Sequence, residues 1–400
     1  MKKPENLRIL IALIIAAIFL NFYISTFPGA WNFTTLRLPD GRPIALDFSN
    51  FWAASKLALS GKPLLVYNNN ALYEVENQFL GTHHPISAFY YPPVFLLIVL
   101  PLGLMSYISS LSVWLGVSLL LYILVLIMIS PKKLLIPFFL IFPGIYINAV
   151  FGQNAFLTGF LLGGGLLLMN NSPIIAGFLL GFLCYKPQFI ALISIALLLG
   201  RYWRVLIATL TTTILLSIIS ALVFGPKMWV TYFKIMPIPM KLLEMGQTAW
   251  CIMPTFFAAT LSAGFSVTAA YLVQAIVIAI VLVGVGWIWG KTDNLALQRA
   301  ILVLGLLLFT PYAHVYELAL LALPLCWLWE DGISNGWLPG EFLLLLCAWL
   351  TPFFLSFIWF SVEIFNGKLQ IGPLVLMMLF LLCLIKWFIR RKPTLISDES

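Results

Sequence analysis

The sequence predicts an all-α integral membrane protein, and three observations lead to that fold class. Of the 400 residues, 62% are hydrophobic and 9% are charged, and the mean hydropathy is +1.04. The apolar share of a soluble domain is nearer one half. Many windows hold about 18 or more uncharged apolar residues, enough to cross about 30 Å of hydrocarbon as a helix. These runs lack the alternation of a membrane β-strand, so we expect helices to make the crossings.

We expect one polytopic membrane domain over residues 1–400, with about twelve crossings. They are predicted at residues 9–27, 91–107, 110–129, 134–150, 154–169, 173–199, 203–224, 267–289, 298–311, 315–329, 340–360 and 371–389. The first run has no small-x-small cleavage site, which favours a retained anchor over a signal peptide. Basic residues at the N-terminus and in segment 386–392 place both termini in the cytoplasm, with residues 393–400 as a polar cytoplasmic tail.

The basic residues of the loops leave one part of this topology open. Arg201, Arg204, Lys291 and Arg299 fall on the cytoplasmic side of the twelve-crossing scheme, whereas the pair Lys132 and Lys133 falls outside. If that pair is cytoplasmic, the chain between residues 91 and 200 must contain a re-entrant or broken helix. The orientation of the pair and the helix count therefore stay open.

Two external loops are predicted to carry short helices that lie on the membrane surface. The first loop, residues 28–88, contains candidate helices at 48–60 and 69–80, and Asp47 lies at the start of the first one. The second loop, residues 225–254, intersperses aromatic residues with lysines. Such ordered patterns are typical of a scaffold, because a flexible tether would be rich in Gly and Ser.

Several functional classes are disfavoured by the sequence. The five cysteines are scattered and odd in number, without a CxxC pair, so they indicate packing and no disulfide framework. His83 and His84 lack a third ligand nearby and precede a proline, which favours a turn over a metal site. The net charge of +8 is assigned mostly to membrane topology, with anionic membrane lipids as partners or a phosphate-bearing substrate as the alternative sources, and nucleic acid is not an expected partner. No nucleotide-binding motif, DxD pattern or cofactor signature occurs, so no cofactor is predicted.

Polar residues in or beside apolar helices are costly and therefore indicate function. Five stretches qualify, in this order along the chain: residues 46–68 (LDFSNFWAASKLALSGKPLLVYN), 90–93 (YYPP), 151–154 (FGQN), 186–188 (KPQ) and 310–325 (TPYAHVYELALLALPL). Their order and spacing resemble glycosyltransferase family 87, over about residues 40–330. Its members are GT-C type α-mannosyltransferases that depend on polyprenyl-phosphate mannose.

The resemblance implies a GT-C type multi-pass enzyme of a bacterial-type plasma membrane, the cell inner membrane. Such an enzyme moves a hexose, mannose by analogy, from a polyprenyl-phosphate carrier to a hydroxyl of a glycolipid or glycan acceptor on the external face. It also implies that the acid of the first external loop, here Asp47, is the catalytic base. The chain departs from the family at Glu317, where many relatives carry Asp.

The chemistry of Asp47 agrees with a role as general base. A polyprenyl phosphate is a good leaving group, so the step needs an activated acceptor hydroxyl and little acid assistance. We expect a helix N-terminus to keep the pKa of this carboxyl low, and a single displacement to invert the anomeric centre. The alternative is that Asp47 only caps its helix.

Other candidates for substrate binding have equally specific alternatives. Lys186 either contacts the lipid phosphate or pairs with an internal carboxylate or snorkels to the interface. His314, Glu317 and Tyr312 either contact sugar and phosphate or pack against each other; His314 and Glu317 are one turn apart. The remaining candidates either read sugar hydroxyls or serve as helix caps and interfacial aromatics: Gln153, Asn154 and Tyr91.

Two other functions compete with the transferase. A multi-pass transporter or flippase for a lipid-linked or small polar substrate would also have about a dozen helices, but its inverted repeats with paired broken helices are not seen. A non-catalytic assembly protein would tolerate Asp47→Asn. The sequence names neither the sugar nor the acceptor, and it leaves the oligomeric state open.

Overall fold

The structure is a computed structural model that describes residues 3–30, 45–80, 88–130, 135–360 and 370–390. In these ranges the regular structure is helical, which confirms the all-α fold class. Five of the described helices are long and apolar enough to cross a membrane: α1 (Lys3–Ala30), α5 (Tyr107–Ile129), α11 (Trp203–Phe224), α15 (Val267–Lys291) and α20 (Gly372–Arg390). The chain is a multi-pass membrane protein, while the count of twelve crossings stays a prediction.

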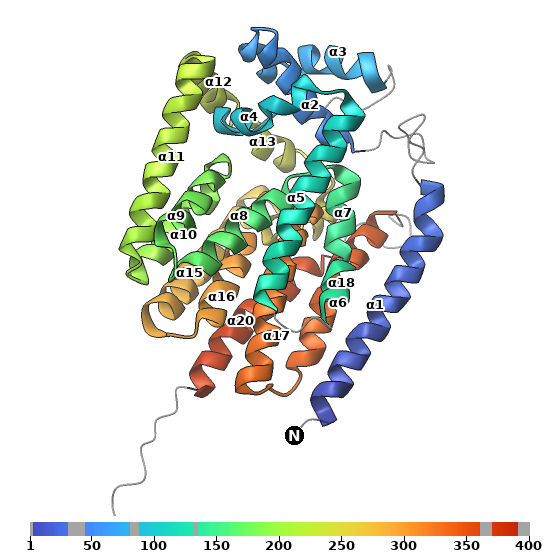
Figure 1. Cartoon of the computed structure of the whole chain (residues 1–400), viewed down its shortest axis with the longest axis vertical. Helices are drawn as coiled ribbons and strands as arrows, with labels where there is room; N and C mark the ends of the chain where they lie inside the picture. The colour runs from blue at the N-terminus through green and yellow to red at the C-terminus, as the bar shows by residue number, and fades with distance from the viewer. Residues whose placement is uncertain (1–2, 31–44, 81–87, 131–134, 361–369, 391–400) are drawn as a thin grey trace, which may run out of the picture.

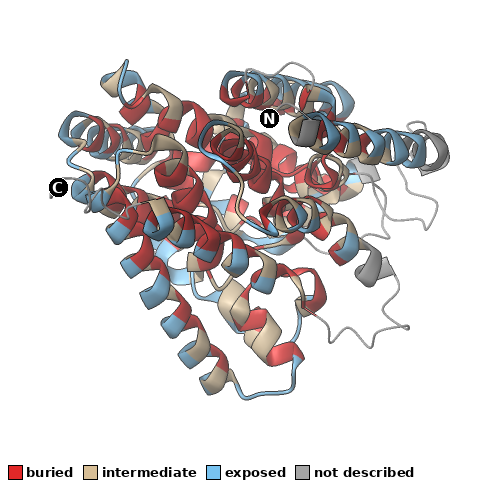
Figure 2. Ribbon diagram, turned by 90° about the horizontal axis from the view of Figure 1, so that it is seen from below, coloured by how far each residue is buried: buried red, intermediate tan, exposed pale blue. Residues whose placement is uncertain are grey.

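Shorter apolar segments fill the interior of the bundle. They are α6 (Ile136–Leu140), α7 (Pro143–Phe151), α8 (Ala155–Leu168), α9 (Pro173–Gly181), η4 (Phe182–Tyr185), α10 (Pro187–Leu199), α16 (Leu295–Phe309), η6 (Val315–Leu321), α17 (Ala322–Asn335) and α18 (Glu341–Phe360). Figure 2 shows buried residues concentrated in the middle of the bundle and exposed residues on the outward faces of the peripheral helices. The outward faces are apolar, as expected for helices in contact with lipid.

A layer of short helices covers one end of the bundle, at the top of Figure 1. This cap layer consists of α2 (Leu46–Leu59), η1 (Pro63–Tyr67), α3 (Asn69–Leu80), α4 (Pro93–Val99), η2 (Leu100–Leu104), α12 (Lys227–Ile235) and α13 (Ile238–Glu244). The helices predicted at 48–60 and 69–80 are confirmed by α2 and α3, and residues 225–254, predicted as a second external loop, contain the helices α12 and α13. The chain returns from α13 to the bundle through η5 (Trp250–Ile252) and α14 (Phe256–Ser262).

Four predicted crossings are not single α-helices, and one of them, at 315–329, is divided between η6 and α17. Residues 91–107 form α4 and η2, which together extend about 18 Å and pack against α2 in the cap layer. Residues 173–199 are broken at Lys186, because Pro187 supplies no N–H and pushes the preceding residue out of the helical region. The run at 134–150 is interrupted between α6 and α7, just before Pro143.

These breaks leave the orientation of the basic loops open. The stretch between residues 91 and 200 does contain broken helices, which is the alternative to twelve uninterrupted crossings. Lys132 and Lys133 themselves lie outside the described residues. The neighbouring helix α5 runs from the cap layer toward the end of the bundle at which α1 begins and α20 ends (Figure 1).

Helix α2 is buried on nearly all sides and differs in this from the expected surface helix. Nine of its residues are buried, among them Phe48 and Trp52, whose rings pack against Tyr107 at 5.5 and 5.7 Å between centroids. These two rings therefore belong to the core. Four side-chain hydrogen bonds fix the helix: Ser55 Oγ to the Val99 carbonyl (2.8 Å), Trp52 Nε1 to the Met105 carbonyl (3.1 Å), Ser49 Oγ to Glu76 Oε1 (2.7 Å) and Tyr107 Oη to the Ala45 carbonyl (3.2 Å).

Candidate functional site

A cavity of about 580 Å³ lies where the cap layer meets the bundle. Its size is within the range of small-molecule sites. Among its lining residues, the charged side chains are those of Asp47, Lys186 and Glu317. The cavity is also lined by His314, Tyr91, Gln153 and Tyr312, so seven of the eight residues singled out from the sequence share one cavity. We call it the reaction cavity.

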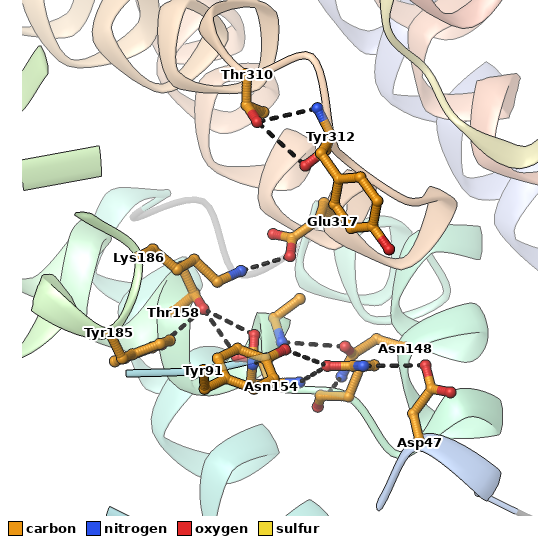
Figure 3. A network of polar contacts seen from close by, with 12 residues as sticks. Asp47, Tyr91, Asn148, Asn154, Thr158, Tyr185, Lys186, Thr310, Tyr312 and Glu317 are labelled. Atoms are coloured by element: carbon orange, nitrogen blue, oxygen red, sulfur yellow. Dashed lines mark hydrogen bonds and ion pairs between the residues drawn. The ribbon is translucent and has the colours of Figure 1, made fainter. Parts of the chain in front are cut away.

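Asp47 is held toward the cavity by a chain of amide and hydroxyl groups. Gln153 Nε2 donates to Asp47 Oδ2 at 3.0 Å, and Tyr91 Oη donates to Gln153 Oε1 at 3.2 Å. Asn154 Nδ2 donates to Tyr91 Oη at 2.8 Å. Figure 3 shows this chain leading from Asp47 to Tyr91 and Asn154. Asn154 is not one of the lining residues and stands behind Tyr91, so its direct contact with substrate stays a prediction.

The turn between α7 and α8 brings Gln153 to Asp47, and Gly152 makes that turn possible. Gly152 has φ +69°, in the left-handed region that glycine tolerates without strain. A Cβ at this position would lie 2.6 Å from Phe48 Cβ and 2.8 Å from Ala45 Cβ. The turn therefore packs directly against the start of α2, with no room for a side chain at Gly152. The next residue, Gln153, reaches the Asp47 carboxylate.

The environment of Asp47 contradicts one expectation. Burial raises the pKa of the Asp47 carboxyl from 3.8 to about 6, the hydrogen bond from Gln153 acts in the opposite direction, and the charge of Glu76 adds to the rise. The predicted low pKa is wrong because desolvation outweighs the attraction of the helix N-terminus. Asp47 does not cap α2, because its side chain accepts a hydrogen bond from Gln153 and none from the N-terminal N–H groups of the helix.

Lys186 lies across the cavity at the break between η4 and α10. Its Nζ forms an ion pair with Glu317 Oε1. Of the alternatives predicted for Lys186, the structure therefore shows the pairing with an internal carboxylate. The other oxygen of this carboxylate, Oε2, is buried and has no hydrogen-bond partner. The exposed fractions of the two side chains are 6% and 13%, so this pair faces the cavity and little bulk water.

The segment between α16 and η6 contributes the imidazole. Thr310 Oγ1 bridges the backbone of Tyr312, accepting from its N–H at 3.2 Å and donating to its carbonyl at 3.1 Å. His314 stacks on Tyr316 at 5.3 Å and meets Tyr312 edge-on at 5.1 Å. Burial lowers the pKa of His314 to about 4, so the ring is neutral at pH 7. In Figure 3 the Tyr312 ring projects toward the space beside Glu317.

Asn50 is a candidate that the sequence reasoning missed. It lies three residues after Asp47, one turn along α2, so both side chains are on the same helix face. Its side chain lines the reaction cavity, the residue is 4% exposed, and its Oδ1 has no hydrogen-bond partner. The i, i+3 spacing from the acid was the signal that could have identified it.

The other predictions have mixed outcomes. Tyr90 lines the cavity as an interfacial aromatic could. Lys56 contacts the ring of Trp52 at 5.3 Å, which is compatible with a solvated lysine. His83 and His84 lie outside the described residues, as does the tail at 393–400. Four of the five cysteines are buried, and Cys347 is exposed.

Five long apolar helices, together with a cavity lined by two carboxylates, an ammonium and an imidazole, define a multi-pass membrane protein with an enzyme-like site. The model of glycosyltransferase family 87 matches residues 89–311, more than half of the chain, and the protein belongs to that family. It is therefore a transferase that acts on a sugar donor and an acceptor. Neither a curated protein nor a solved structure matches the chain.

The family match is shorter than the resemblance over residues 40–330. It contains Tyr91, Gln153, Asn154 and Lys186, whereas Asp47 lies before it and residues 312–317 follow it. The cavity joins the two groups, because lining residues come from both inside and outside the matched range. The roles of the individual side chains therefore depend on the geometry, and we treat them as proposals.

Proposed function

We propose that the protein transfers a hexose, mannose by analogy with the family, from a polyprenyl-phosphate carrier to an acceptor hydroxyl on the external face of the membrane. The observation that carries this proposal is that three side chains line the same cavity: Asp47 from the cap layer, and Lys186 and His314 from the bundle. A general base and a phosphate-binding cation are the two groups that such a transfer requires.

In the proposed step, Asp47 accepts the proton of the acceptor hydroxyl. The acceptor oxygen then forms a bond to the anomeric carbon of the sugar, and the bond from that carbon to the phosphate oxygen breaks. The donor is a phosphodiester with one negative charge, and the departing lipid phosphate carries two. The displacement inverts the anomeric centre, so a β-linked donor gives an α-linked product.

Lys186 and His314 are proposed to receive the charge that develops on the phosphate. The ion pair with Glu317 holds the ammonium at the cavity wall before the donor binds. A phosphate oxygen can compete for this ammonium, while a neutral imidazole donates one N–H. Donors aimed at a leaving phosphate stabilise the transition state more than the ground state, which is the condition for catalysis.

Gln153, Tyr91 and Asn154 are proposed to position the base. The amide of Gln153 holds one oxygen of Asp47 and leaves the other for the acceptor. Burial also raises the pKa of Tyr91, so its hydroxyl stays protonated and continues to donate to Gln153. Asn50, on the same face of α2 as Asp47, has a free amide oxygen for a sugar or acceptor hydroxyl.

The test uses the purified full chain in nanodiscs, with radiolabelled mannosyl polyprenyl phosphate as donor and a membrane glycolipid extract as acceptor. Asp47→Asn is expected to lower transfer by about 10²–10⁴-fold, the usual contribution of a general base. The matched control is Asp293→Asn, which makes the same chemical change at an exposed residue between α15 and α16. Full activity in Asp47→Asn would refute the assignment of the base.

Two further readouts separate the parts of the proposal. Glucosyl and galactosyl polyprenyl phosphates are offered in parallel, so that the sugar and the carrier are tested independently. A product with β linkage from a β-linked donor would contradict the single displacement. Movement of the intact donor across the membrane of a proteoliposome, without loss of its sugar, would favour the flippase instead.

A further inference from the structure

A second cavity, of about 300 Å³, lies in the cap layer beside the reaction cavity. Eight residues line it: Tyr67, Asn68, Asn69, Asn70, Phe89, Tyr90, Ile235 and Ile238. The lining contains amides, aromatic rings and aliphatic groups, and no charged side chain. The reaction cavity, in contrast, is lined by three charged residues.

The two cavities are neighbours. Tyr90 lines both of them, and the connection between α12 and α13 contributes to both as well. Ile235 lines the small cavity, whereas the next residue, Met236, lines the reaction cavity. A molecule seated in the small cavity is therefore separated from the reaction cavity by no more than this shared wall.

The amides of the small cavity are available to a ligand. Asn68 caps α3, because its Oδ1 accepts from the N–H groups of Asn70 and Ala71 at 3.0 and 3.2 Å. The side chains of Asn69 and Asn70 take no part in that cap and are exposed. Tyr67 is anchored, since its hydroxyl donates to the Tyr91 carbonyl at 3.0 Å. The wall thus combines two unused amides with a fixed aromatic ring.

We propose that this small cavity binds a neutral sugar unit of the acceptor. An amide group both donates and accepts hydrogen bonds, which matches the hydroxyl groups of a sugar. Aromatic rings offer apolar surface to the C–H face of such a ring with little loss of entropy. A phosphate is not the expected occupant, because the lining carries no cation to neutralise it.

This inference rests on the proposed function and adds that donor and acceptor bind in separate cavities. The charged reaction cavity takes the phosphate-linked donor, and the uncharged cavity holds the acceptor glycan at its side. Because Tyr90 is shared, a hydroxyl of the bound acceptor can extend past that ring toward Asp47 and Asn50, which both line the reaction cavity. Acceptor choice is then set in the cap layer, mainly by residues that line only the small cavity.

The experiment measures binding of methyl α-mannoside, mannotriose and maltotriose to the full chain in nanodiscs by saturation-transfer NMR. Glucose 6-phosphate serves as a charged comparison. At least one neutral sugar is expected to bind, and Asn69→Ala/Asn70→Ala is expected to weaken its binding by about tenfold, for the loss of two hydrogen bonds. The cap of α3 stays intact because Asn68 is unchanged.

The matched control is Asn170→Ala/Asn171→Ala, which removes two consecutive exposed asparagines in the turn between α8 and α9. This control is expected to bind the neutral sugar as the wild type does. If no neutral sugar binds, or if both double variants bind it equally, the subsite is refuted. The same holds if glucose 6-phosphate binds better than the neutral sugars and depends on Asn69 and Asn70.

Transfer assays distinguish this failure from a failure of the proposed function. For the Asn69→Ala/Asn70→Ala variant we expect the KM for the glycolipid extract to rise, while slow hydrolysis of the donor in the absence of extract is unchanged. If the wild type consumes the donor but the Asn69→Ala/Asn70→Ala variant binds the neutral sugar as tightly as the wild type does, only the proposed subsite is wrong. If the wild type consumes none of the sugar-linked polyprenyl phosphates, the proposed function is wrong instead.

Discussion

Two groups of charged side chains in the described part of the chain differ in how completely they are paired. One is the reaction cavity under the cap layer, with Asp47, Lys186 and Glu317. The other, which we call the inner ion cluster, joins α17, α18 and α20 at the opposite end of the bundle (Figure 1). It consists of Asp331, Glu341, Lys386 and Arg390.

The inner ion cluster is saturated with partners. Lys386 pairs with Glu341 and, at 2.7 Å, with Asp331, and the side chains of all three are 0% exposed. Further donors surround the two carboxylates: Arg390 (2.8 Å to each oxygen of Asp331), Asn294 (2.9 Å) and Asn335 (2.8 Å) on Asp331, and the Leu338 N–H on Glu341 (2.8 Å). Such pairing is what permits charges to be buried, and it leaves nothing for a ligand.

The reaction cavity leaves its polar groups short of partners. Asp47 receives one amide hydrogen bond, and buried oxygens of Glu317 and Asn50 receive none. A native structure retains unsatisfied buried groups only where something compensates for them. The comparison therefore teaches that charge alone does not mark a functional site in this membrane protein. In the reaction cavity the charged groups lie in a cavity beside unpaired buried oxygens, and the inner ion cluster lacks both features.

The largest expected effect comes from exchanging the two buried lysines for methionine. Lys386→Met leaves two carboxylates fully buried beside one remaining cation, and we expect it to destabilise the fold by about 3–5 kcal/mol. Lys186→Met removes the cation of the reaction cavity. We expect it to lower transfer by about 10²-fold or more while destabilising by about 1 kcal/mol, because Glu317 faces the cavity.

Both variants are measured in the same detergent, by the unfolding midpoint from tryptophan fluorescence and by transfer per folded molecule. Each serves as the control for the other, since the same residue type is exchanged in both. The distinction between the two clusters fails if Lys186→Met destabilises as much as Lys386→Met and keeps its activity when folded.

Asp47→Asn is expected to stabilise the protein even as it abolishes transfer. The folded-state pKa of about 6 lies above the ordinary 3.8, so ionised Asp47 lowers stability at neutral pH. A neutral amide avoids that loss, which amounts to about 1–3 kcal/mol for a shift of this size. The gain should be present at pH 7.5 and shrink as the pH falls through 6 toward 4, because wild-type Asp47 is then protonated in the folded state and increasingly protonated in the unfolded state.

The measurement compares the unfolding midpoints of wild type and Asp47→Asn at pH 7.5 and pH 4.5. Asp293→Asn, at an exposed position, is expected to change the midpoint little at either pH. A midpoint that drops in Asp47→Asn at pH 7.5 would show that this carboxylate is structural and belongs with the inner ion cluster.

The pH dependence of transfer gives a smaller and independent effect. Only the ionised form of Asp47 can accept a proton, so the rate is expected to fall about tenfold per pH unit below about 6 and to be level above it. His314 stays neutral down to a pKa of about 4 and adds no second limb in this range. A rate that stays constant down to pH 4.5 would indicate a base with an ordinary carboxyl pKa and contradict the raised pKa of Asp47.

The sequence predicted the elements of this fold better than their connections. Apolar runs identified α5, α11, α15 and α20 within a few residues, because lipid imposes both length and composition on a crossing helix. The same criterion failed at residues 91–107, 134–150 and 173–199, which are divided between shorter helices. Pro143 and Pro187 begin new helices within the second and third of these runs, and hydropathy does not register such a break.

The candidate site was predicted as a set of residues and not as a geometry. Polar residues beside prolines and glycines identified Lys186 and Gln153, and the structure brings both to the cavity of Asp47. The raised pKa of Asp47 could not be predicted, because it depends on burial by helices that are distant in sequence. Asn50 was missed because a buried amide without a partner is visible only once its surroundings are known.

Tyr91→Phe tests the smallest expected effect and the indirect part of the site. The change removes the hydroxyl that donates to Gln153 and accepts from Asn154, so the amide of Gln153 is held less firmly against Asp47. We expect transfer to fall about three- to tenfold, for one hydrogen bond of about 1 kcal/mol. The acidic limb should also move to higher pH, because the bond from Gln153 lowers the pKa of Asp47 and is weakened.

That shift separates positioning from a purely structural role. Tyr202→Phe is the matched control, because it removes a tyrosine hydroxyl that donates to Gln298 Oε1 at 3.3 Å, away from the reaction cavity. It should leave both the rate and the pH limb unchanged. If Tyr91→Phe lowers the rate without moving the limb, Tyr91 contacts substrate directly. If neither quantity changes, the hydrogen-bond chain behind Asp47 contributes nothing to catalysis. The activity of the reaction cavity then depends on Asp47, Lys186 and Glu317 and not on the residues that position the base.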